Sequence, residues 1–159
     1  MRFLRQADAL MMATLVTLGA ATPAPAAPAA AAHAHAHPAE GPHHGTLIEL
    51  GREDYHAELV HDQKADTVTI YILDAAAAAA VPIAAAPLTL NVRAGGTAQQ
   101  FPLAAKPQST DPVGTSSAFT TGDKRVGQAL HAKGATGHLN VEIAGKRYVG
   151  RVGGHSHAH

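Results

Sequence analysis

The sequence predicts a mainly β domain of antiparallel strands, and three observations support this fold class. Short segments of alternating apolar and polar residues recur along the chain, separated by turn residues at regular intervals. Two such segments are joined only by Ala144-Gly145, as in a tight β-hairpin. The repeated strand-helix alternation of parallel sheets is missing. About seven short strands with one short helix indicate an antiparallel β-sandwich, closest in pattern to an immunoglobulin-like fold without its disulfide.

The first half of the folded part contains four expected strands. Residues 46–50 (TLIEL) are expected to form a short strand, and residues 51–54 (GRED) a turn. The next strand covers residues 55–62 (YHAELVHD), and its period of two places His56 and Glu58 on one face. Residues 67–74 (TVTIYILD) are β-branched or aromatic at most positions, as in a buried strand. Alanines 75–80 favour a helix, but Pro82 and Pro87 interrupt it, so a loop or one loose helical turn is expected before the alternating strand LTLNVRA.

The second half contains the expected helix and the clearest hairpin. Gly95-Gly96 marks a turn into residues 97–106 (TAQQFPLAAK). A proline-rich surface loop is expected over residues 107–117 (PQSTDPVGTSS), followed by a brief strand over residues 118–121 (AFTT). Val126, Ala129 and Leu130 have helical spacing, with Asp123 to cap the helix and Gly134 to end it. The segment HLNVEIAGKRYVGRV is the hairpin, in which Leu139, Val141 and Ile143 alternate with polar residues.

Composition excludes several classes of function. Lysine plus arginine equals aspartate plus glutamate at 12 each, so the chain lacks the basic excess of a nucleic-acid-binding surface. No cysteine is present, which rules out thiolate metal sites and thiol catalysis. Motifs of zinc proteases, serine hydrolases, P-loops and dinucleotide-binding folds are missing, so we expect no enzyme activity.

The N-terminus has the features of a secretory signal peptide. Arg2 and Arg5 precede an apolar run and then small residues, which predicts a signal over residues 1–26 with cleavage as late as Ala32. Residues 27–45 then form a disordered arm rich in alanine, proline and histidine, residues 46–152 the β-sandwich domain, and residues 153–159 a histidine-rich tail. The expected location is periplasmic or secreted, with no membrane anchor after cleavage.

Histidine clusters at the two ends of the chain are the main functional signal. Imidazole is a common ligand of zinc and copper(II), and several rings on one segment can capture an ion together. Every methionine lies in the leader, which disfavours copper(I). The sequence therefore predicts a divalent transition-metal cofactor, zinc or copper(II), bound by His33, His35, His37, His43, His44, His155, His157 and His159. The alternative is that these tails are solubilising spacers.

Two more specific metal sites are also possible. Cleavage after Ala30 would create the N-terminus Ala31-Ala32-His33, a square-planar nitrogen set that suits copper(II) or nickel. Within the domain, His56, Glu58 and His61 could meet His138 and Glu142 if their strands are neighbours, so that two imidazoles and a carboxylate converge. The alternative is that these five are ordinary solvent-facing residues of half-buried strands. His131 is expected to act as a favourable cation at the end of its helix.

Most of the expected folded part resembles a group of small exported bacterial proteins common in planctomycete-like genomes. The resemblance lies in the segments GPHHGTLIELGREDYHAELVHD, TVTIYILD and GHLNVEIAGKRYVGRV and in the histidine-rich tail. GPHHGTLIEL is also similar to the G-P-H-G-G motif at the periplasmic start of heavy-metal efflux adaptor subunits, although His44 stands where that motif has glycine. Periplasmic copper-resistance sandwiches are similar in outline. These resemblances imply a periplasmic context and metal handling.

We therefore expect periplasmic divalent metal binding or sequestration, with metal ions and a metal efflux or uptake system as partners. The alternative is a non-catalytic interaction or structural module of the cell envelope, in which the histidine-rich tails are incidental.

Overall fold

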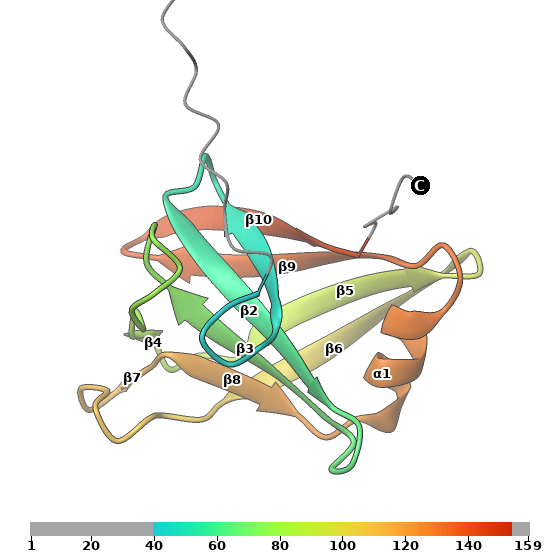
Figure 1. Cartoon of the computed structure of the whole chain (residues 1–159), viewed down its shortest axis with the longest axis horizontal. Helices are drawn as coiled ribbons and strands as arrows, with labels where there is room; N and C mark the ends of the chain where they lie inside the picture. The colour runs from blue at the N-terminus through green and yellow to red at the C-terminus, as the bar shows by residue number, and fades with distance from the viewer. Residues whose placement is uncertain (1–39, 154–159) are drawn as a thin grey trace, which may run out of the picture. The chain divides into compact units, whose positions relative to one another are not determined.

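Ten strands and one helix make up residues 40–153, the part of the chain described by the computed structural model (Figure 1). The first five strands are β1 (Thr46–Leu50), β2 (Tyr55–Asp62), β3 (Thr67–Leu73), β4 (Ile83–Ala84) and β5 (Leu88–Ala94). They are followed by β6 (Thr97–Ala105), β7 (Thr115–Ser116), β8 (Ala118–Thr121), α1 (Lys124–His131), β9 (Thr136–Ile143) and β10 (Lys146–Val152). The prediction of a mainly β, antiparallel domain with one short helix is confirmed.

Eight of these strands form one continuous antiparallel order, β1-β2-β3-β8-β6-β5-β9-β10. The first and last strands of this order, β1 and β10, lie against each other, so the sheet curves into a nearly closed, barrel-like shape (Figure 1). Gly150 of β10 permits this approach, because a Cβ there would lie 2.5 Å from Ile48 Cγ2 and 2.9 Å from Leu50 Cδ2. The closing seam therefore depends on a residue without a side chain.

The alternating patterns predict the inward faces correctly. Leu88, Leu90 and Val92 of β5 are all buried, and β9 alternates exposed and buried residues along its whole length. The core inside the curved sheet contains the large buried side chains Phe101, Phe119, Ile70, Ile72 and Leu139. Ala144 and Gly145 have φ values of 50° and 78°, the left-handed conformations that a two-residue turn of this hairpin type requires.

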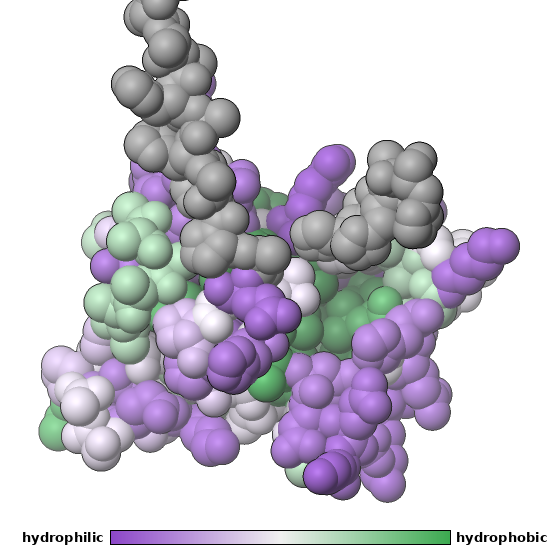
Figure 2. Space-filling view, viewed as in Figure 1, coloured by the Kyte–Doolittle hydropathy of each residue, from purple (hydrophilic) through white to green (hydrophobic). Residues whose placement is uncertain are grey.

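Helix α1 is confirmed, with a different end from the one predicted. Asp123 caps it by accepting a hydrogen bond from the Arg125 N–H at 3.0 Å, as expected. The helix ends at His131 with Ala132 as its C-cap, before Gly134. Gly134, at φ 72°, instead serves the turn into β9, where the Ala135 N–H donates to the Ala132 carbonyl. Hydrophilic side chains cover the surface around α1, while Val126 and Ala129 face the core (Figure 2).

Two segments expected to be loops contain short paired strands. Ile83 of β4 pairs with Ser116 of β7, far away in the sequence. Two residues are too few to show any periodicity, and the pairing depends on Asp111, which holds the second segment in place by accepting hydrogen bonds from the Ser117 N–H and Oγ.

Among residues 40–153, no helix is long and apolar enough to span a membrane. The predicted signal peptide at 1–26 lies outside the described residues.

Candidate functional site

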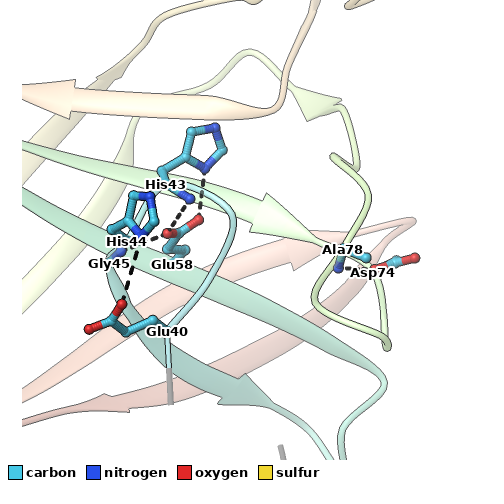
Figure 3. A network of polar contacts seen from close by, with 7 residues as sticks. All are labelled: Glu40, His43, His44, Gly45, Glu58, Asp74 and Ala78. Atoms are coloured by element: carbon cyan, nitrogen blue, oxygen red, sulfur yellow. Dashed lines mark hydrogen bonds and ion pairs between the residues drawn. The ribbon is translucent and has the colours of Figure 1, made fainter. Parts of the chain in front are cut away.

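The carboxylate of Glu58, in the middle of β2, is completely buried. Its Oε1 accepts hydrogen bonds from the backbone N–H groups of His43 and Gly45, each at 2.8 Å (Figure 3). Its Oε2 lies 2.7 Å from His43 Nδ1. A carboxylate oxygen accepts hydrogen bonds, so in the His43–Glu58 contact the Nδ1–H of the His43 ring is the donor.

A tight turn over residues 40–45 covers this carboxylate. The Gly41 N–H donates to the Gly45 carbonyl and the His44 N–H to the Gly41 carbonyl, each at 3.0 Å, and a β-bridge joins Glu40 to Thr46. A Cβ on Gly45 would stand 2.8 Å from Glu58 Cγ, and one on Gly41 would collide with the Glu58 carboxyl group. The two glycines thus allow the turn to lie directly on β2.

This turn corrects the predicted boundary between arm and domain. The sequence predicts residues 40–45 as the end of the disordered arm, because almost no side chain there can be buried. They belong to the folded part instead, since their backbone supplies the donors that a buried carboxylate requires.

The His43 ring is held in one orientation from two sides. Besides the Glu58 hydrogen bond, it stacks on Tyr71 with ring centroids 3.7 Å apart and planes inclined by only 5°. Tyr71 of β3 is the cross-strand partner of Glu58, so both contacts come from one place in the sheet. The side chain remains 42% exposed, and Figure 3 shows its second nitrogen, Nε2, pointing away from the carboxylate. A fixed imidazole with an outward lone pair results.

His44 follows in the same turn and is oriented differently. Its side chain is 89% exposed, and its Nδ1 lies 3.8 Å from Glu40 Oε2, a surface contact of little energetic value. Its φ of 61° lies in the left-handed region, which glycine adopts without strain. This is the position where the adaptor motif G-P-H-G-G has glycine.

The other predicted ligands are dispersed. His56 is buried, and its Nδ1 donates to the Asp74 carbonyl at 3.2 Å. His61 lies at the other end of β2, where its Nδ1 is 2.9 Å from Nε2 of His131. His138 is exposed on β9, which is not a neighbour of β2, so the condition for a shared site with His56 and Glu58 is not met. Among residues 40–153, no three histidine or acidic side chains cluster as a metal site.

The alternative that His56 and Glu58 are ordinary solvent-facing residues is wrong. The 40–45 turn covers Glu58, and the segment after β3 contacts His56. The two ends of the histidine-rich sequence, His33, His35, His37, His155, His157 and His159, lie outside the described residues.

Asp74 organises the segment that contacts His56. Its Oδ1 accepts a hydrogen bond from the Ala78 N–H at 2.9 Å (Figure 3) and another from the Ala79 N–H at 3.1 Å. These bonds hold the pKa of the Asp74 carboxyl below its ordinary value. The resulting stabilisation is present above the unfolded-state pKa of about 4 and is lost as pH falls through the lower folded-state pKa.

Replacing Asp74 with alanine should release the Ala78 and Ala79 amides. We expect their hydrogen-exchange protection at pH 6 to fall in Asp74→Ala, and to fall in the wild type below about pH 4. Asp62→Ala is the matched control, since Asp62 holds the Lys64 and Ala65 amides of the β2–β3 turn in the same way. Unchanged protection of Ala78 in Asp74→Ala would show that other contacts hold the segment.

Sequence reasoning named His43 and Glu58 but did not pair them, and it missed Tyr71 and Gly41. The available signal was the G-P-H-H-G pattern itself, in which two glycines flank a histidine pair just before a strand. No protein-family model, curated protein or solved structure matches the chain significantly.

Proposed function

We propose that this protein binds and sequesters a divalent transition metal ion, zinc or copper(II), with His43 as the anchoring ligand. The observation that carries the proposal is the buried Glu58 carboxylate, which holds His43 Nδ1 at 2.7 Å while Nε2 remains outside. Metal-bound histidines commonly donate their other ring nitrogen to a carboxylate in this way.

This arrangement has three effects that favour metal binding. The hydrogen bond from Nδ1 places the lone pair on Nε2, and the negative charge of Glu58 makes that nitrogen a stronger donor. Stacking on Tyr71 reduces the rotamer entropy that the ring would lose on coordination. A single solvent-exposed histidine has none of these advantages.

The remaining ligands come from the histidine-rich sequence around this anchor. His44 is adjacent, and His37, His35 and His33 precede His43 by six to ten positions. A tetrahedral zinc site needs four ligands, and the chain offers more than that at its two ends, counting His155, His157 and His159. The proposed binding is therefore exchangeable and can involve several ions, without catalysis.

The proposed setting is the periplasm or the cell exterior, following the secretory signal over residues 1–26. An efflux or uptake system for the same metal is the proposed partner. An immunoglobulin-like sandwich remains the proposed finer description of the mainly β fold.

A second candidate function is a non-catalytic interaction module of the cell envelope. An open hollow of about 1080 Å³ favours it, located between the β4 region and the β9–β10 hairpin. Its wall includes the apolar side chains Val81, Ile83, Val141, Tyr148 and Val149, of which Val149 is 59% exposed. In this reading the histidines have no physiological ligand.

Calorimetric titration of the full chain with zinc and copper(II) tests the metal proposal. We expect binding tighter than about 10 µM at neutral pH, with the tightest event lost in His43→Gln. His138→Gln is the matched control, because it removes an exposed imidazole on β9, a strand that does not neighbour β2, and it should retain that event. Absence of any binding tighter than about 10 µM would reject metal sequestration in favour of the interaction module.

A further inference from the structure

Two histidines that are 70 positions apart in the sequence meet at the surface, away from Glu58. His61 comes from the end of β2 and His131 from the last turn of α1. His61 Nδ1 lies 2.9 Å from His131 Nε2, with ring centroids 5.1 Å apart and planes inclined by 32°. His61 is partly buried and His131 is exposed, so solvent reaches the pair from one side.

Gly127 provides the space for the His61 ring. A Cβ at this position would stand 2.7 Å from His61 Nε2 and 2.8 Å from its Cε1. Glycine inside a helix is destabilising relative to alanine, so its presence here requires a local reason. Gly127 and His131 are four residues apart and therefore lie on one helix face, with the His61 ring packed along it. The positions of the two rings are therefore fixed by the packing of β2 against α1.

We propose that His61 Nδ1 and His131 Nε2 chelate a copper(II) ion, forming a second metal site between β2 and α1. With metal–nitrogen bonds of about 2.0–2.1 Å, adjacent ligands of a square-planar ion are roughly 2.8–3.0 Å apart, whereas tetrahedral ligands are roughly 3.3–3.4 Å apart. The separation of 2.9 Å matches the square-planar value. Copper(II) prefers that geometry and binds imidazole more strongly than the other divalent ions of its row.

Binding requires both facing nitrogens to offer lone pairs. In the metal-free protein one of them carries the proton of the hydrogen bond between the rings. In the chelate His61 carries its proton on Nε2 and His131 carries its proton on Nδ1, where water accepts the hydrogen bond. Among the described residues no third histidine or carboxylate joins the pair, so water completes the coordination of the ion.

This site is independent of the proposed anchor at His43. The 40–45 turn covers Glu58, whereas the His61 ring packs on Gly127 and His131. Glu58 and His61 are three residues apart on β2 and project from opposite faces of the strand. Copper at one site therefore does not require copper at the other, and each can be tested separately.

The experiment is a copper(II) titration of the ¹⁵N-labelled full chain followed by NMR. Paramagnetic copper broadens nearby amide signals, so Gly127, which lies against the His61 ring, reports on the His61–His131 pair. We expect the Gly127 signal to disappear at substoichiometric copper, and to persist in His131→Gln with the loss of one bound equivalent. His138→Gln is the matched control, since it removes an exposed histidine elsewhere and should leave the broadening of Gly127 intact.

Two results would overturn the proposal. One is a Gly127 signal that survives until all other copper sites are saturated. The other is broadening of Gly127 that persists in His131→Gln, which would mean that copper on other histidines causes it. The titration is repeated in His43→Gln, where the Gly127 signal should still disappear, so failure of the His43 proposal leaves the second site supported. Circular dichroism of His131→Gln, expected to match the wild type, excludes unfolding as the cause.

Discussion

Replacing Glu58 with alanine should lower the free energy of unfolding by about 3–5 kcal/mol, because hydrogen bonds to a charged acceptor contribute about 1.5–3 kcal/mol each and their buried donors would lose their partner. The carboxylate accepts from two backbone N–H groups and from the His43 ring. The substitution also leaves a cavity beneath the 40–45 turn. Urea denaturation followed by circular dichroism measures the effect, and the amides of His43 and Gly45 should lose their exchange protection.

Glu58→Gln separates the structural role of this residue from its proposed role in metal binding. The amide oxygen can still accept from the backbone, so we expect less than half of the stability loss of Glu58→Ala. The neutral amide no longer supports the His43 imidazole as a carboxylate does, so affinity at that site should fall about 10–100-fold, the usual effect of removing such a supporting group. Unchanged affinity in a folded Glu58→Gln would refute the anchoring role of Glu58.

Substituting Gly150 with alanine should destabilise the seam between β1 and β10 by about 1–3 kcal/mol, the usual cost of overpacking. The added methyl group would lie 2.5 Å from Ile48 Cγ2 and 3.3 Å from the Glu49 carbonyl oxygen. Because Ile48 and Leu50 are core residues, they have little room to move. The loss exceeds the roughly 0.4–1 kcal/mol that alanine gains by restricting the unfolded chain.

Thermal unfolding provides the measurement, with a decrease in Tm of at least about 4 °C per kcal/mol for a domain of this size. Gly122→Ala is the matched control, since a Cβ there meets nothing within 4 Å and its φ is not positive. It should leave Tm unchanged or slightly higher. Equal Tm values for Gly150→Ala and Gly122→Ala would show that β1 and β10 are not tightly packed.

Local patterns predicted most of the strands and their inward faces. Alternation along β5 and β9 works because each residue flips to the opposite face of a strand, so the sequence itself records which side is buried. The Ala144-Gly145 turn and the Asp123 cap are equally local, since both depend on the conformation of a few adjacent residues. Strands of two residues, such as β4 and β7, are too short to show this alternation.

The sequence by itself determined most of the strands of residues 40–153, the helix α1 and the concentration of histidines near the two ends of the chain. Only the tertiary structure decided that Glu58 is buried beneath a turn and that His43 stacks on Tyr71. It also decided that His61 meets His131 while His138 lies on a strand that β2 does not touch. The physical reason is that these features depend on contacts between residues far apart in the chain, both for the order of the strands and for the backbone donors that cover a polar face. Periodicity carries no information about such contacts.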